Sequence, residues 1–347
     1  MKVLRNCWYQ AAWAEELALD AMLARTVAET PLLLVRDTDG AVSALLDRCP
    51  HRFAPLSAGK LEGGIVTCGY HGLAFDGSGA CVHNPHGRVT PSLRVAGFPL
   101  VERHTALWIW LGDAAKADLA LIPDLSYIDA APPNARIAGY LPAAAHYELL
   151  TDNILDLSHA DYLHPGSLGG MMTNAKTTTR IEGDAVIVAW DAVNCDPPGA
   201  FVGLVPPPQK GDFWLEARWA APAVMTLATF AAPTGSSRTP DATALTLHSM
   251  TPETSATTHY FYCNTRPYLV DDVDFSAFLR GQLERAFSLE DKPMLEKQQA
   301  RMGSADFWTL GPALLAIDAA AVQARRKLAT MIAQETPTDG VPAERRA

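Results

Sequence analysis

Short apolar runs, separated by turn residues, fill the first third of the chain. These runs are each followed by Gly or Asp, and they span residues 31–36, 41–46, 65–68, 73–75 and 106–111. Asp39-Gly40 separates the first two runs, which is a sequence signature of a β-hairpin. The pattern predicts a small all-β domain over residues 1–112, in which the loops that contain Cys49 and Cys68 lie at the tips of hairpins.

A helical pattern begins after a stretch rich in Ala, Pro and Asp, residues 113–140, which we interpret as a connector. From His146 onward, apolar residues recur every three to four positions, as they do on one face of a helix. Strand-like runs then follow at residues 177–181, 185–190, 213–219, 224–230, 244–249 and 257–263.

Two further helical segments are predicted at residues 274–301 and 312–334, and residues 336–347 are predicted to be a disordered tail. Consecutive strands bordered by helices favour an antiparallel sheet with the helices on one side. We therefore expect an α+β domain over residues 141–335.

Composition narrows the class of protein. The chain has 347 residues, of which 48% are hydrophobic and 19% charged, so it is globular with room for two domains. A net charge of −10 argues against a nucleic-acid-binding surface. The N-terminus has no signal-like apolar run, and Asp318 interrupts the longest apolar stretch, so we expect a cytoplasmic protein without a membrane partner. In that compartment the six cysteines favour thiols or metal ligands over disulfides.

The clearest candidate site combines Cys49-Pro50-His51 with Cys68-Gly69-Tyr70-His71. Each segment supplies one cysteine and one histidine, whereas a zinc finger usually places two cysteines first and two histidines later. The alternation favours a Rieske [2Fe–2S] cluster, in which Cys49 and Cys68 bind one iron and His51 and His71 the other. A structural zinc site is the alternative.

A second candidate metal site lies about Asp152, Asp156, His159 and His164. On a helix, the two aspartates and His159 would share one face. His164 could converge with His159 if the helix ended there, which Pro165 favours because it disfavours helical geometry in the preceding residue. Two histidines and a carboxylate can hold Fe(II) and leave positions open for O2.

The carboxylate of the second site need not be local. Glu290-Asp291-Lys292-Pro293 places two acids and a proline inside an otherwise helical pattern, as expected where a side chain is directed toward a site. A buried core residue remains the alternative for each histidine taken alone.

Together, these motifs resemble the oxygenase component of a Rieske non-haem iron oxygenase, and the resemblance covers residues 1–335. Three segments are most similar to the vanillate O-demethylase and dicamba monooxygenase branch, and they are residues 5–9, 49–56 and 247–254. The resemblance implies an N-terminal Rieske domain and a helix-grip-like catalytic domain. It also implies that His159, His164 and Asp291 bind the catalytic Fe(II), with Asn153 close to the metal.

The resemblance further implies a homotrimer in which electrons pass between subunits. Asp156 would link His71 of a neighbouring subunit to His159. The electrons would come from NAD(P)H through a separate flavin and iron–sulfur reductase. Consistent with this, the sequence has no G-x-G-x-x-G dinucleotide-binding motif.

For the substrate, the resemblance implies a polar contact from His248. Leu227 and Gln282 occupy positions where the dicamba enzyme has a substrate-binding Asn and Trp, which disfavours dicamba itself. We expect O2-dependent O-demethylation of an aromatic acid, a vanillate-like methoxybenzoate, to a phenol and formaldehyde. The alternatives are oxidation of an aryl methyl group, as in an aryl sulfonate, and ring hydroxylation. An electron carrier with a degenerate second site is disfavoured, because it would need only the N-terminal domain.

Overall fold

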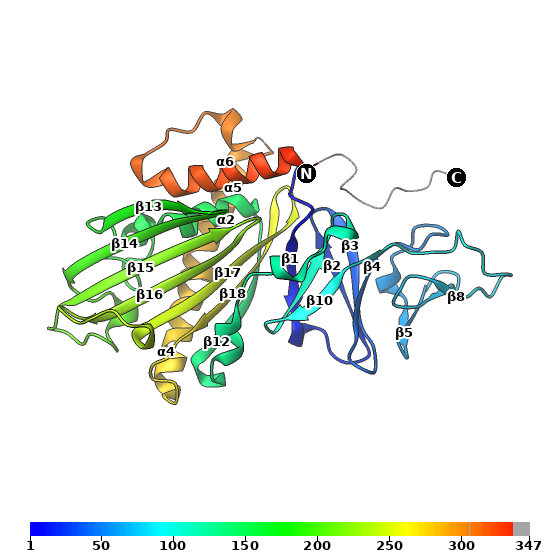
Figure 1. Ribbon diagram of the computed structural model, residues 1–347, viewed down its shortest axis with the longest axis horizontal. Coiled ribbons are helices and arrows are strands. Elements are labelled where there is room, and N and C mark those ends of the chain that lie inside the picture. Colours follow the sequence, from blue (N-terminus) through cyan, green and yellow to red (C-terminus); the bar gives the residue numbers. More distant parts are fainter. Residues whose placement is uncertain (305, 336–347) are drawn as a thin grey trace. The chain divides into compact units, whose positions relative to one another are not determined.

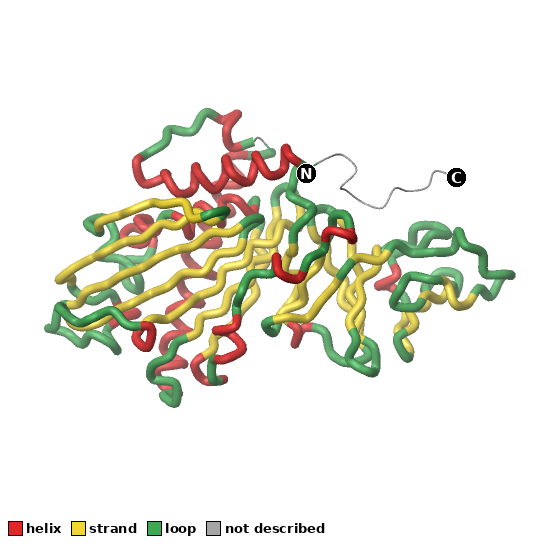
Figure 2. Tube along the Cα trace, viewed as in Figure 1, coloured by secondary structure: helices red, strands yellow, loops and turns green. Residues whose placement is uncertain are grey.

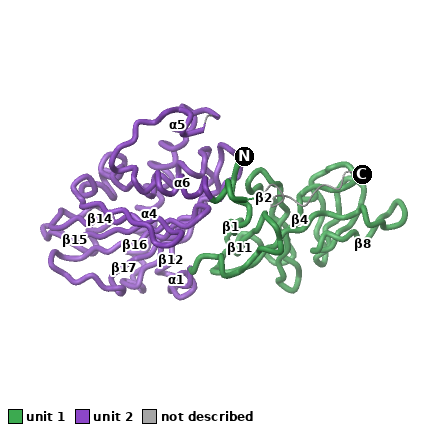
Figure 3. The backbone as a smooth tube through the Cα atoms, turned by 45° about the horizontal axis from the view of Figure 1, so that its top comes forward, with its two compact units in different colours: residues 1–124, 331–347 green, residues 125–330 purple. Residues whose placement is uncertain are grey.

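The computed structural model describes residues 1–304 and 306–335, and the chain divides into two units (Figure 3). The first unit comprises residues 1–124 with the C-terminal segment from Met331, and the second comprises residues 125–330. The boundary between the two units, after Asp124, falls within the predicted connector, residues 113–140. The predicted disordered tail, residues 336–347, lies outside the described residues.

The first unit consists mainly of strands and loops, with a few short 3₁₀ helices (Figure 2). Its strands form three sheets, with the orders β1-β11-β10, β2-β3-β4-β9 and β5-β6-β7-β8. The strands are β1 (Trp8–Trp13), β2 (Ala21–Val27), β3 (Thr30–Arg36), β4 (Val42–Leu46), β5 (Lys60–Glu62), β6 (Ile65–Thr67), β7 (Ala74–Phe75), β8 (Cys81–His83), β9 (Gly97–Phe98), β10 (Leu100–Arg103) and β11 (Ala106–Trp110). All five apolar runs predicted for this region are therefore confirmed as strands.

The predicted hairpin between β3 and β4 is confirmed, since the two strands pair antiparallel. The Asp37 carboxylate accepts a hydrogen bond from the Ala41 amide at 2.8 Å, and Gly40 has a φ of 87°, which suits glycine. The prediction that both cysteine loops lie at hairpin tips is only half right. The second loop joins the paired strands β6 and β7, but the first loop crosses from β4 to β5 in another sheet.

The second unit contains a seven-stranded antiparallel sheet in the order β12-β18-β17-β16-β15-β14-β13. The strands are β12 (Arg136–Ala143), β13 (Lys176–Glu182), β14 (Ala185–Cys195), β15 (Gly211–Ala220), β16 (Val224–Pro233), β17 (Thr243–Thr254) and β18 (Thr257–Thr265). The six predicted strands are confirmed. The sequence did not predict β12, because Gly139 and Pro142 weaken its strand signal. Both are tolerated because β12 is an edge strand, and Gly139 leaves room for the ring of Tyr262.

Helices pass behind this sheet in the view of Figure 1 and also lie along its β13 edge. They are α1 (Ser126–Ala130), α2 (Tyr147–Leu155), α3 (Ala160–Leu163), α4 (Val273–Glu284), α5 (Lys292–Met302) and α6 (Ala319–Gln334). A π-helix, η9 (Arg285–Asp291), joins α4 to α5, and the amide of Lys292 bonds to the carbonyl of Phe287, five residues back. The helix predicted over 274–301 is thus present with a π-helical segment inside it.

The last predicted helix begins later than expected, at Ala319 rather than at residue 312. The Asp318 carboxylate accepts a hydrogen bond from the Leu315 amide at 2.6 Å, so this acid stabilises the turn that precedes α6. Among the residues that the structure describes, no helix is both long enough and apolar enough to cross a membrane.

Candidate metal centres and active-site cavity

The two cysteine loops of the first unit repeat one backbone pattern. The carbonyl of Cys49 accepts a hydrogen bond from the Phe53 amide at 2.9 Å, and the carbonyl of Cys68 accepts one from Gly72 at 3.0 Å. In both loops the cysteine amide also donates to the carbonyl five residues on, at 2.8 Å. Phe53 and Gly72 both have positive φ, 59° and 75°. The loops are therefore near-copies of each other, fixed by their own backbone hydrogen bonds.

The four predicted cluster ligands point together from these loops. Cys49 and Cys68 are both 2% exposed and their thiols neighbour each other. Burial raises the pKa of the Cys49 thiol. The rings of His51 and His71 lie nearer the surface, with their centroids 4.5 Å apart. This donor set fits a [2Fe–2S] cluster, in which the buried thiolates would hold one iron and the two imidazoles the other. A nearby histidine, His86, contacts the carbonyl of His71 through Nε2 at 2.9 Å.

The second metal centre begins where α2 ends. Asp156 follows the helix with a φ of −135°, and its carboxylate accepts a hydrogen bond from the Ser158 amide at 3.0 Å. It thereby caps a short 3₁₀ helix, Leu157–His159, so the predicted single helical face through Asp156 and His159 is wrong. The predicted helix end is confirmed, because α3 stops at Leu163 and His164 leaves helical geometry.

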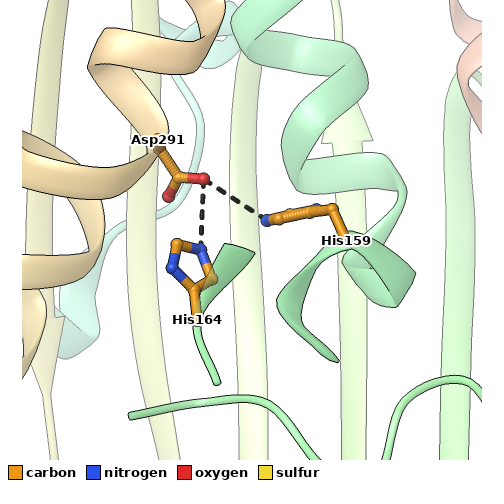
Figure 4. A group of neighbouring side chains, drawn as sticks. All are labelled: His159, His164 and Asp291. Atoms are coloured by element: carbon orange, nitrogen blue, oxygen red, sulfur yellow. Dashed lines mark ion pairs between the residues drawn. The ribbon is translucent and has the colours of Figure 1, made fainter. Parts of the chain in front are cut away.

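Three side chains converge at this centre, as Figure 4 shows. The Asp291 Oδ1 atom lies 3.4 Å from Nε2 of His159 and 3.1 Å from Nε2 of His164. The ligand atoms of the three residues all lie within 4.8 Å of one another. Asn153 is adjacent, and its amide Nδ2 donates to Asp291 Oδ1 at 3.0 Å. Two imidazoles and one carboxylate on one side of a cavity fit a mononuclear Fe(II) with open positions.

The outer nitrogen of each histidine is also held in place. His159 Nδ1 pairs with the backbone carbonyl of Asp156. His164 Nδ1 pairs with a carboxylate oxygen of Glu290 at 2.7 Å, and the other oxygen of Glu290 accepts from Arg285 at 2.8 Å. These contacts direct both Nε2 atoms toward the metal. The sequence had drawn attention to Glu290 only as a neighbour of Asp291, since its partner His164 comes from a distant segment.

Charge at the centre favours metal binding. Burial alone would raise the pKa of Asp291, but its hydrogen bonds to His159 and His164 lower that pKa to about 2. The carboxylate is therefore ionised at neutral pH, as a metal ligand must be.

A cavity of about 110 Å³ opens onto the three ligands. Its lining includes Leu227, His248 and Gln282, which the sequence had singled out as substrate contacts. Burial lowers the pKa of His248 to about 3, so its imidazole is neutral, and Nδ1 pairs with the Tyr260 hydroxyl at 2.7 Å. The lining also includes Phe201, so the Pro-rich loop over residues 195–209 contributes to the wall.

Sequence reasoning missed two polar residues of the same wall, Thr246 and Asn264. They lie opposite each other on β17 and β18, and the Asn264 amide donates to the Thr246 hydroxyl at 2.8 Å. Alternation along both strands could have indicated that they share a face with His248. It could not have indicated that this face borders a cavity.

Comparisons with known proteins agree with this geometry. Residues 7–96 match the family model "Rieske [2Fe-2S] domain", and residues 143–334 match "Vanillate O-demethylase oxygenase C-terminal domain". The oxygenase component of dicamba O-demethylase from Stenotrophomonas maltophilia is 39% identical, covering 94% of this chain and 97% of that protein. A vanillate O-demethylase oxygenase subunit from a Pseudomonas species is 33% identical, covering 88% of this chain and 94% of that protein.

An iron–sulfur subunit of the toluene-4-sulfonate monooxygenase system from Comamonas testosteroni is 37% identical, covering 85% of this chain and 88% of that protein. Among solved structures, dicamba monooxygenase bound to 3,6-dichlorosalicylic acid superposes with a TM-score of 0.90 at 36% identity. That match covers 96% of this chain and 98% of the other.

Proposed function

Because the chain belongs to the vanillate O-demethylase family of Rieske non-haem iron oxygenases, we propose that it demethylates an aryl methyl ether. As an oxygenase component, it receives its electrons from a separate reductase. The observation that carries the proposal is the cavity that opens directly onto His159, His164 and Asp291. A substrate bound there would place a methyl group beside the metal position.

The proposed reaction balances as a monooxygenation. One O2, two electrons and two protons convert the methoxy carbon to a hemiacetal and release one water. The bond between this carbon and the aryl ether oxygen then breaks, the hydroxyl proton of the hemiacetal passes to the ether oxygen, and the products are a phenol and formaldehyde. Bound Fe(II) supplies the activation of O2.

The protein side chains have separate tasks in this reaction. His159, His164 and Asp291 would hold the metal on one side, which leaves the cavity side open. Asn153 donates to Asp291 and so fixes the carboxylate. The apolar wall, including Leu227, would hold the ring and exclude water.

For electron delivery we propose a homotrimer in which the cluster of one subunit meets the iron centre of the next. In support, exposed aromatic residues border the cluster histidines: Phe53 is 70% exposed and Tyr70 is 60% exposed. On the second unit, a cleft beside His159 is lined by Asp156 and by Met294, which is 49% exposed. Asp156 would then form the polar link between the neighbour's His71 and this chain's His159.

The leading substrate is a vanillate-like methoxybenzoate, and a flavin and iron–sulfur reductase is the proposed electron donor. The test supplies such a reductase, NADH and O2 to the purified oxygenase, then measures formaldehyde from a panel of methoxybenzoates. We expect formaldehyde in proportion to NADH consumed. Formaldehyde from none of the panel would contradict O-demethylation.

A second reaction is favoured by the similarity to the toluene-4-sulfonate monooxygenase subunit. The same panel should therefore include toluene-4-sulfonate, whose methyl oxidation would give a benzyl alcohol and no formaldehyde. Product analysis by chromatography separates the two reactions.

A further inference from the structure

We propose that Met171 and Met172 are sites of oxidative self-modification. When O2 is reduced at the iron centre but no substrate is oxidised, the thioether groups of these two residues would be converted to sulfoxides. The inference rests on the proposed function only through O2 reduction at the iron centre, and it does not depend on which substrate is oxidised.

The two methionines carry the only sulfur atoms among the described residues that line the cavity. The other lining side chains are hydrocarbon chains or rings, or they carry hydroxyl, amide, imidazole or carboxylate groups. A thioether is soft and polarisable, and its oxidation to the sulfoxide is a common lesion in proteins. Within this cavity, an oxidant would therefore react at these two residues.

Burial restricts where such an oxidant can come from. Met171 is 2% exposed and Met172 is 3% exposed, so an oxidant in the surrounding solution has little access to either. Both residues line the cavity that opens onto His159, His164 and Asp291. An oxidant formed at the iron centre would be released into the same cavity.

Backbone hydrogen bonds hold both methionines in place. The amides of Met171 and Met172 donate to Asp161 Oδ1 at 3.1 Å and 3.0 Å. The same carboxylate accepts from the amides of Gly170 at 2.6 Å and Thr173 at 2.7 Å. Because four consecutive amides donate to one side chain, neither methionine can leave the cavity wall without breaking these bonds.

The same segment is tied to a metal ligand. The carbonyl of His164 accepts hydrogen bonds from the amides of Ser167, Leu168 and Gly169 at 3.1, 3.2 and 2.9 Å. Gly169 also lies against α3, where a Cβ atom would come within 2.3 Å of the Ala160 carbonyl oxygen. The chain that follows His164 is therefore folded back on this ligand, which keeps the two methionines beside the iron centre.

The proposed modification balances without a further reactant. One O2, two electrons from the reductase and two protons give hydrogen peroxide when no substrate is attacked. The O–O bond of the peroxide then breaks, one oxygen atom forms a bond to the thioether sulfur, and the other oxygen leaves as water. The sulfur loses the two electrons that the peroxide gains.

Oxidation of this wall would damage the enzyme. A sulfoxide is polar and chiral, whereas the neighbouring lining residues Leu168 and Phe201 are apolar. A polar group buried among apolar side chains without a partner is destabilising. We therefore expect the enzyme to lose activity progressively while it reduces O2 without forming product.

The test compares an internal with an external source of peroxide. In the first arm, the iron-loaded oxygenase receives reductase, NADH, O2 and benzoate, which has no methyl group, and catalase destroys peroxide that reaches the solution. In the second arm, iron-free protein receives hydrogen peroxide directly. Peptide mass spectrometry measures the sulfoxide at each methionine. Met302 of α5 is the reference, because it is partly exposed and does not line the cavity.

The order of oxidation should reverse between the two arms. In the first arm we expect at least about tenfold more sulfoxide at Met171 and Met172 than at Met302, because the oxidant forms inside the cavity. In the second arm we expect Met302 to be oxidised first, because exposure then determines access.

A variant links the sulfoxides to the loss of activity. Replacing both residues, Met171→Leu with Met172→Leu, keeps a similar volume and removes both sulfur atoms. With benzoate present, this variant should complete at least about threefold more turnovers before it loses half of its own initial rate of NADH oxidation. Met302→Leu is the matched control and should lose activity as fast as the unmodified protein. Mass spectrometry of the unmodified protein remains a test if the double variant does not fold.

The outcomes separate this inference from the proposed function. Sulfoxide at Met302 ahead of the pair in the first arm, or NADH oxidation that leaves both Met171 and Met172 unchanged, would overturn it. Turnover in which all NADH is recovered as oxygenated product would do the same, and so would equal oxidation of the pair in the two arms. Sulfoxides at the pair, without formaldehyde from any methoxybenzoate, would support the inference and contradict O-demethylation.

Discussion

The two metal centres of this chain are assembled in opposite ways. The cluster ligands come from Cys49–His51 and Cys68–His71, two short loops that repeat one backbone hydrogen-bond pattern. Of the iron ligands, His159 ends a short 3₁₀ helix and His164 follows α3. Asp291 ends the π-helix η9, far along the chain from both histidines. The first centre is shaped mainly within its own loops, and the second depends on the packing of distant segments.

This difference determines where each centre is vulnerable. In the cluster loops, hydrogen bonds between neighbouring backbone atoms already fix the geometry, and a side-chain substitution at one position leaves those bonds in place. At the iron centre, Asn153, Glu290 and the Asp156 carbonyl hold the ligands from outside, so substitutions that touch no metal should still alter metal affinity.

The largest expected effect comes from removing one ligand at each centre. His159→Ala should abolish product formation, while the red-brown cluster absorbance remains. This loss exceeds the roughly 10- to 100-fold loss of activity expected when a residue that only supports a metal ligand is replaced. Cys68→Ser should remove that absorbance and keep the mononuclear iron, measured by metal analysis. Loss of both metals from either variant would contradict the separate assembly of the two centres.

A smaller but still severe effect is expected from Asp156→Asn. Asparagine caps a helix about as well as aspartate, so the 3₁₀ turn and both metals should stay. We expect kcat to fall about 100-fold, because the proposed polar link between subunits loses its charge. Reductase-coupled turnover measures this, with Asp241→Asn at an exposed position as the control. Near-normal turnover would exclude the link.

Glu290→Gln should weaken iron binding at the second centre about 10- to 100-fold, because the charged partner of His164 Nδ1 is lost. Titration of the iron-free protein with Fe(II) measures the change. Glu284→Gln, on the exposed side of α4, is the matched control, and cluster absorbance should be the same in both. Equal iron affinity in the two variants would mean that Glu290 does not support the metal ligand.

The last prediction concerns acid stability instead of turnover or metal binding, at the start of α2, which leads into the iron centre. Burial, and then the charge of Arg325, lowers the pKa of His146 from 6.5 to about 4. The neutral imidazole accepts from the Glu148 amide at the start of α2. Because folding lowers the pKa of His146, its neutral imidazole contributes fully to the free energy of unfolding above pH 6.5. This contribution, about 3 kcal/mol, is lost as the pH falls toward 4.

His146→Asn keeps a capping residue but does not titrate, so its unfolding free energy should fall less between pH 6.5 and pH 4 than that of the unmodified protein. Thermal unfolding across this pH range measures the difference. Parallel curves for the two proteins would show that His146 does not contribute to acid unfolding.

The sequence predicted most of what is local. Turn residues located the β3–β4 hairpin, strand-like runs located six strands of the large sheet, and ligand spacing indicated both metal centres. Pro165 indicated the helix end at His164. Each of these features depends on residues that are close together in the sequence, so a sequence pattern can reveal it.

What the sequence did not predict depends on contacts between distant segments. Asp156 is a local exception, because its carboxylate caps the next turn. At Gly139 of β12, a side chain would collide with the ring of Tyr262 on the paired strand β18. In the sequence, neither Glu290 nor Asn264 is marked by its spacing from the metal ligands. Packing places Glu290 against His164 and Asn264 in the wall of the cavity.

The π-helix η9 makes the iron centre sensitive to chain length as well as to residue type. Each residue of an α-helix turns the chain by about 100°, and a π-helical turn accommodates one residue more than an α-helical turn. If this segment became α-helical without losing a residue, the chain would turn further between Arg285 and Asp291, and the Asp291 side chain would rotate away from the histidines. An α-helical segment would need one residue fewer to keep Asp291 in place. The number of residues between α4 and α5 therefore helps to determine the geometry of the metal site.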